Sequence, residues 1–194
     1  MLSAVRSFMR NRLDGYSCIY GAFLLLLLPL RWTVAAVVAA GFHELCHYAA
    51  VRLCGGRVLK LKAHLHGASM EAGGLSSLQE IICILSGPAG SLALLFFAPW
   101  FPRIAVCGAM QGLFNLLPVG SLDGGRALRC LIETAFPVAL ANRLCIILER
   151  VCLLGLVCLG VYGSMVLRLG LFPLIFAIYM CYRAISGQLV RNSF

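Results

Sequence analysis

Residues 33–53, TVAAVVAAGFHELCHYAAVRL, form an apolar run in which His43 and His47 stand four positions apart. The length of this run suits one helix that crosses a bilayer. On a helix, residues i and i+4 share a face, so both imidazoles can reach one metal ion. Glu44 lies about 100° around the helix from His43, where it can take a proton from water beside that ion.

The His-Glu-x-x-His spacing is the pattern found in zinc hydrolases. Short motifs also recur by chance. The apolar surroundings argue against chance here, because polar groups at membrane depth are costly and are usually kept for function. A catalytic zinc ion takes three protein ligands and keeps one position for water, so a third ligand is expected elsewhere in the chain.

The third ligand is expected from the segment Asn115-x-x-Pro118-x-x-x-Leu122-Asp123-Gly124-Gly125. Pro118 ends a helix, and the two glycines let the backbone turn sharply and bring the Asp123 carboxylate toward another helix. Alternatively, Asp123 caps the helix that starts near Gly124. The apolar surroundings favour the ligand interpretation.

The composition is that of an integral membrane protein. Of the 194 residues, 61% are hydrophobic and 12% are charged, whereas soluble domains are about 45–50% apolar and about 25% charged. The formal net charge is +9, but no basic run is interleaved with aromatic residues, so no nucleic acid partner is expected. The excess of Lys and Arg fits orientation by the positive-inside rule.

The hydropathy pattern predicts an all-α polytopic membrane protein, a single domain over residues 1–194. An uncleaved first span is followed by a tight turn at Arg31-Trp32, and Gly55-Gly56 ends the second span. Residues 126–150 are expected to form an amphipathic helix pair broken at Pro137. The six transmembrane helices are expected at about residues 16–30, 33–53, 80–100, 104–118, 151–167 and 171–185.

Residues 57–75, between spans two and three, alternate basic and apolar side chains imperfectly and contain turn-forming glycines. They predict a small β-hairpin or re-entrant segment at the membrane edge, with a strand edge that can pair with an unwound substrate strand. His64 and His66 share one face of any such strand. They could be extra metal ligands, but surface histidines are favoured because three ligands are available elsewhere.

Orientation follows from counting basic residues. With both termini in the cytoplasm, six spans leave Arg31, Arg103 and Arg168 in the outer turns and the other 13 of the 16 basic residues on the inner side. This bias agrees with the positive-inside rule. The same topology brings the two motif halves to the cytoplasmic side of the membrane.

The two motifs together, His43-Glu44-x-x-His47 and Asn115 through Asp123-Gly124, resemble those of the site-2 protease family of intramembrane metalloproteases. The resemblance implies that His43, His47 and Asp123 bind one Zn²⁺ and that Glu44 is the general base. It also implies that Asn115 helps to hold the substrate or the oxyanion. No PDZ or CBS domain is expected.

The stretch Ser86-Gly87-Pro88 resembles the span-three motif of the same family. That motif often continues to an asparagine, and this chain has Ser91 there, a departure that weakens any polar role at this position. The stretch can act by helix packing alone or take a direct part in catalysis.

Within the family, the short six-span pattern is most similar to the subgroup of the stage IV sporulation protein FB type. Members of that subgroup cleave the membrane-associated pro-sequence of a sigma factor. The resemblance implies a membrane-associated protein substrate and a multi-pass location in a bacterial cell membrane, in contact with the lipid bilayer. An inhibitory membrane partner and a second copy of the chain are further partners to consider.

Two other functions fit parts of the pattern. A metal-ion transporter would use the same ligands as a translocation site, and an inactive scaffold would bind partners through its small-residue helix faces. A transporter would tolerate Glu44→Gln better than a peptidase would. A scaffold would be purified without bound zinc.

Overall fold

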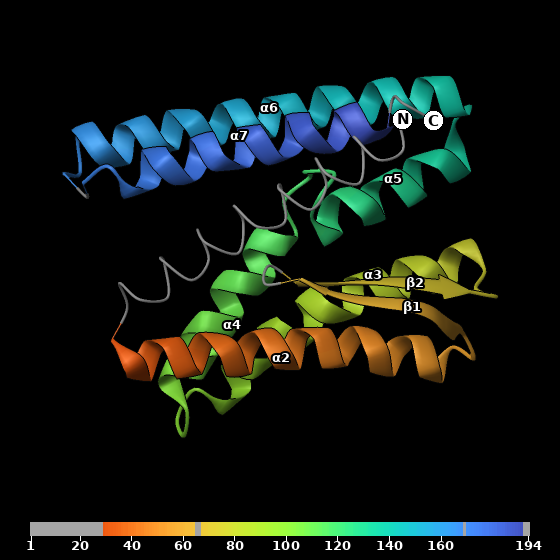
Figure 1. Ribbon diagram of the computed structural model, residues 1–194, viewed down its shortest axis with the longest axis horizontal. Coiled ribbons are helices and arrows are strands. Elements are labelled where there is room, and N and C mark those ends of the chain that lie inside the picture. Colours follow the sequence, from red (N-terminus) through yellow and green to blue (C-terminus); the bar gives the residue numbers. More distant parts are fainter. Residues whose placement is uncertain (1–28, 65–66, 169, 192–194) are drawn as a thin grey trace, which may run out of the picture. The chain divides into compact units, whose positions relative to one another are not determined.

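The computed structural model describes residues 29–64, 67–168 and 170–191. Strands β1 (Arg57–His64) and β2 (Gly67–Gly73) follow the first described helix, and a short 3-10 helix, η1 (Leu94–Phe97), extends the second (Figure 1). Most of the first expected span, residues 16–28, lies outside the described part. The α-helices are α2 (Leu30–Leu53), α3 (Ser77–Ala93), α4 (Pro102–Asn115), α5 (Asp123–Ala135), α6 (Val138–Met165) and α7 (Phe172–Arg191).

Three of the described helical segments are long and apolar enough to cross a membrane: Leu30–Leu53, Ser77–Phe97 and Val138–Met165. Helix α4 has 14 residues, and the apolar part of α7 covers Phe172–Tyr182. Helix α4 and the apolar part of α7 are each shorter than the roughly 17–25 residues of a usual transmembrane helix. The count of six spans therefore stays a prediction.

Two helix boundaries differ from those expected. Helix α2 begins at Leu30 and includes Arg31 and Trp32. The prediction of a tight turn at these two residues is therefore wrong. Pro29 occupies the N-cap with φ −55°, and the fixed φ of proline suits a helix start. Helix α6 runs unbroken from Val138, because neither proline nor glycine interrupts the sequence before Gly155. The fifth expected span is therefore the second part of a longer helix, while the break at Pro137 is confirmed.

The chain groups into two compact units. The first contains the described residues up to Gln79 together with Ser86–Gly112, and the second contains Glu80–Leu85 and the described residues from Leu113 onward. Helix α3 contributes residues to both units. The expected single domain over residues 1–194 stays a prediction.

In the first unit, the two strands form an antiparallel hairpin that packs along α2 (Figure 1). The pairing runs from Arg57 opposite Gly73 to His64 opposite Gly67. Gly55, at the end of α2, has φ +77°, a conformation that glycine adopts without steric cost. The glycine pair thus ends α2 where the sequence predicted.

Helix α4 packs on α3 through small residues, also in the first unit. A Cβ atom at Gly108 would lie 2.9 Å from the carbonyl oxygen of Ser91, and one at Gly112 would lie 3.0 Å from the carbonyl oxygen of Pro88. Glycine at both positions lets the two backbones approach closely, as at many helix contacts in membranes.

In the second unit, α6 and α7 lie side by side, and α5 packs on α6 (Figure 1). Glycine again permits close contact, since a Cβ atom at Gly160 would lie 2.9 Å from the carbonyl oxygen of Pro173. The turn before α5 packs into a core that also contains residues of α6 and α7. The buried core residues are Val119, Leu122, Leu153, Met180 and Ala184.

Candidate metal centre

Helix α2 presents the two motif histidines as a facing pair. Their Nε2 atoms are 3.1 Å apart, and the two ring planes are nearly perpendicular, at 85°. Two nitrogen ligands at about 2.0–2.1 Å from a tetrahedral zinc ion are roughly 3.3–3.4 Å from each other. The pair His43 and His47 therefore has a separation close to that of two ligands of one ion.

Ser91 of α3 holds the opposite edge of the His43 ring. Its hydroxyl oxygen lies 2.9 Å from Nδ1 of His43, and both residues are buried. A ring that donates its Nδ1–H to this hydroxyl keeps the lone pair of Nε2 for a metal, which is the usual arrangement of metal-binding histidines. The expectation of a weakened polar role at Ser91 is therefore wrong.

A signal for Ser91 was present in the sequence. It is a hydroxyl in the small-residue stretch of an apolar helix, and polar groups at that depth need a partner. The sequence did not indicate which partner, because His43 lies 48 residues earlier.

The rest of the Ser86–Ser91 stretch acts by packing on α2. A Cβ atom at Gly87 would overlap the His47 ring, and one at Gly90 would overlap Sγ of Cys46. The hydroxyl of Ser86 donates a hydrogen bond of 3.2 Å to the carbonyl oxygen of Cys46. Small residues thus let α3 lie directly against the histidine face of α2.

Asp123 is the first residue of α5, and Leu122 occupies the N-cap position. The Leu122 side chain makes no capping hydrogen bond. Both interpretations of Asp123, as a metal ligand and as a residue that caps this helix, therefore stay predictions. A carboxylate in the first turn is also favoured by the helix dipole, and the Asp123 side chain is half-buried.

Gly124 and Gly125 place the first turn of α5 against the preceding backbone. A Cβ atom at Gly124 would overlap the carbonyl of Leu116, and one at Gly125 would overlap the carbonyl of Val119. Both glycines are helical. The prediction that they allow a sharp turn of the backbone is therefore wrong. Their role is to permit close packing of the helix start that carries Asp123.

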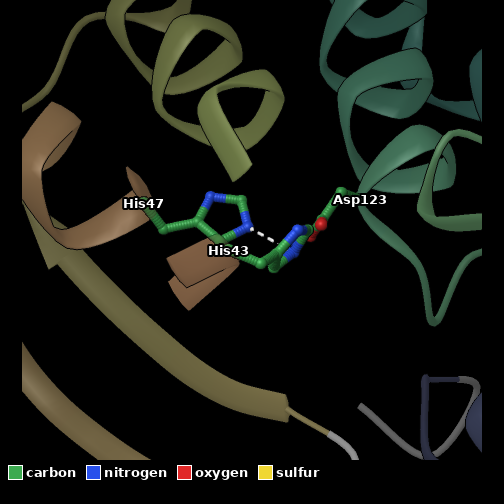
Figure 2. A group of neighbouring side chains, drawn as sticks. All are labelled: His43, His47 and Asp123. Atoms are coloured by element: carbon green, nitrogen blue, oxygen red, sulfur yellow. Dashed lines mark hydrogen bonds between the residues drawn. The ribbon is translucent and has the colours of Figure 1, made fainter. Parts of the chain in front are cut away.

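One ligand atom from each of His43, His47 and Asp123 lies within 4.8 Å of those of the other two (Figure 2). A search of the described residues for three or more His, Cys, Asp or Glu side chains with ligand atoms this close together finds these three residues. Two imidazoles and a carboxylate match the nitrogen and oxygen ligands that zinc prefers. The three residues could hold a metal ion.

The other residues singled out in the sequence lie on defined elements. Glu44 follows His43 on α2, Asn115 is the last residue of α4, and both are half-buried. Their roles as general base and substrate-holding residue stay predictions. His64 ends β1 and His66 lies outside the described residues, so the surface role expected for both also stays a prediction.

Comparison with known proteins gives a family match and a structural match. The model of peptidase family M50 matches residues 60–159, just over half of the chain, a range that includes Asn115 and Asp123 but begins after the histidine pair. The structure is similar to that of a site-2 protease from Methanocaldococcus jannaschii, with a TM-score of 0.65 and 16% sequence identity over 88% of this chain and 87% of that chain. At this identity the likeness shows the fold. No curated protein sequence matches the chain significantly.

Proposed function

The chain belongs to peptidase family M50, and from this premise we propose that it is an intramembrane zinc endopeptidase. It would hydrolyse a peptide bond in or near a membrane-embedded segment of a protein substrate. The observation that supports this most directly is the His43, His47 and Asp123 group, whose ligand atoms lie within 4.8 Å of one another. Its two histidines belong to a helix that is apolar enough to cross a membrane.

In this proposal, His43, His47 and Asp123 together hold one Zn²⁺. Three protein ligands of this kind are the usual set of a catalytic zinc site. When bound, zinc supplies a Lewis acid that polarises the scissile carbonyl and makes water more acidic. Ser91 keeps the His43 ring oriented for this task through the 2.9 Å contact to Nδ1.

Glu44 is the proposed general base. Its carboxylate takes a proton from the attacking water as the water oxygen bonds to the carbonyl carbon, and it then passes that proton to the leaving amine nitrogen as the C–N bond breaks. Asn115 is proposed to donate a side-chain amide hydrogen bond to the carbonyl oxygen, where negative charge develops in the transition state.

The test compares the wild-type chain with Glu44→Gln, using zinc content and cleavage of a co-expressed membrane-anchored substrate as the two measurements. We expect the variant to keep its zinc and to lose cleavage. Glu133→Gln, on the exposed side of α5, is the matched control and should cleave normally. Undiminished cleavage by Glu44→Gln would remove the mechanism, and zinc uptake into vesicles without cleavage would instead identify a transporter.

The substrate that we propose is a membrane-associated pro-sequence of a sigma factor, and the location is the bacterial cell membrane with both termini in the cytoplasm. Support comes from the likeness of the short motif pattern to the sporulation subgroup and from the distribution of basic residues. Co-expression with such a pro-protein tests the substrate, since an unprocessed pro-protein beside an active enzyme would exclude it. Reporter fusions at each loop test the orientation.

A further inference from the structure

Helix α6 carries a buried carboxylate that the proposed reaction does not use. Glu149 is 3% exposed and belongs to Val138–Met165, a helix long and apolar enough to cross a membrane. A charged group inside such a helix is costly, and residues of this kind usually persist because they have a function. Oε1 of Glu149 accepts a hydrogen bond of 3.0 Å from the backbone amide of Gly120.

Gly120 lies in the tight turn that precedes α5. The amide of Leu122 donates to the carbonyl oxygen of Val119 at 2.8 Å, which makes residues 119–122 a hydrogen-bonded β-turn. The hydrogen bond that closes such a turn joins its first and fourth residues, so the amide of the second residue, Gly120, takes no part in it. The Glu149 carboxylate supplies the acceptor for that amide, and hydrogen bonds to a charged acceptor are stronger than those between neutral groups.

The same turn is packed on both sides. Val119 and Leu122 lie in the core with Leu153, which follows Glu149 by one helical turn and so shares its face of α6. On the other side, a Cβ atom at Gly125 would lie 2.8 Å from the amide nitrogen of Gly120. The turn is therefore held between α6 and the start of α5, and Asp123 follows it directly.

We propose that Glu149 is a positioning residue for the Asp123 turn. By accepting the Gly120 amide, its carboxylate fixes residues 119–122 and so sets where the Asp123 side chain leaves the backbone. The effect on the turn depends only on the hydrogen bond and the packing. The effect on metal binding rests, in addition, on the proposed function.

The test uses the purified full-length chain in lipid nanodiscs with three variants. Glu149→Leu removes the acceptor and keeps a side chain of similar size, while Glu149→Gln keeps an acceptor oxygen. Arg150→Leu, at the exposed neighbouring position on α6, is the matched control. The measurements are amide hydrogen exchange over residues 116–123 and zinc affinity by competition with a chelator.

We expect exchange over this segment to be at least about tenfold faster in Glu149→Leu, with Glu149→Gln and Arg150→Leu close to wild type. Zinc affinity should fall by about 10–100-fold in Glu149→Leu, as for other residues that orient metal ligands. A folded Glu149→Leu variant with unchanged exchange would overturn the proposal.

Two further measurements keep the outcomes distinct. Should Glu149→Leu fail to fold, the wild-type chain in excess chelator decides: a protected Gly120 amide supports the proposal, and an amide that exchanges as fast as an open loop overturns it. A wild-type chain that binds no zinc would remove the proposed function, whereas the exchange comparison would still test the role of Glu149 in the turn.

Discussion

The hydroxyl oxygen of Ser91 lies 2.9 Å from Nδ1 of His43, and neither side chain reaches the surface. This contact joins α3, which carries none of the three candidate metal ligands, to α2, which carries two. The opposite nitrogen of the same ring lies 3.1 Å from Nε2 of His47. The orientation of the His43 ring thus depends on a helix that follows it in the chain and packs against it through small residues.

Replacing Ser91 with alanine should weaken metal binding more than it weakens the fold. Loss of one hydrogen bond costs about 1 kcal/mol of stability, whereas loss of a residue that orients a metal-binding histidine lowers affinity by about 10–100-fold. The measurement is zinc affinity by chelator competition, together with the helical circular dichroism signal.

Ser86→Ala is the matched control for this variant. Ser86 also donates from α3 to α2, but its acceptor is the Cys46 carbonyl oxygen and not a ligand side chain. Its zinc affinity should stay close to that of the wild type. Equal affinities for Ser91→Ala and the wild type would show that the Ser91 hydroxyl does not orient His43.

Gly87→Ala should displace His47. The added Cβ atom would overlap the imidazole, and a side chain can swing aside more cheaply than a backbone can move. We expect a folded protein with strongly reduced zinc content. Gly41→Ala is the control on α2, because a Cβ atom there meets nothing within 4 Å; its zinc content should be normal. Normal zinc content in Gly87→Ala would contradict the close approach of α3 to His47.

The sequence could predict the histidine pair because helical spacing alone places His43 and His47 on one face. It could also predict Asp123 as a ligand candidate, since a carboxylate among apolar residues needs a purpose. The partner of Ser91 could not be predicted, because that contact depends on how two helices pack. The continuation of α6 past residue 150 was missed for a related reason: residues 126–150 were expected to form a separate amphipathic helix pair, yet Glu149 is buried and accepts a hydrogen bond from the turn before α5.

Gly124→Ala should damage both stability and metal binding. Here the added Cβ atom would overlap the backbone carbonyl of Leu116, which cannot rotate away, so the start of α5 must shift. Overpacking of this kind typically costs about 1–3 kcal/mol. Thermal unfolding and zinc affinity are the measurements, and both should decrease. Gly155→Ala, at a position with open space on α6, should leave both unchanged or raise stability slightly.

The thiol of Cys130 on α5 should react slowly with alkylating reagents at pH 8. Burial raises its pKa above the ordinary value of 9.0, and the nearby negative charge of Glu80 raises the pKa further. Because the thiolate is the reactive form, alkylation should accelerate only as the pH rises above 9. Glu80→Gln removes one cause of the shift and should increase the rate at pH 8. Equal rates in both variants would contradict the proximity of Glu80 to Cys130.

Leu61→Pro tests whether the β1–β2 hairpin takes part in substrate binding. Leu61 lies opposite Met70 within the paired strands, and proline there removes a backbone amide and disturbs the ladder. Since the histidine pair lies on α2, we expect zinc content to stay normal while cleavage of a membrane-anchored substrate slows. Leu61→Val, which keeps a strand-forming residue, should cleave at the wild-type rate. Because an unwound substrate strand needs a free strand edge to pair with, unchanged cleavage by Leu61→Pro would mean that the substrate is held elsewhere.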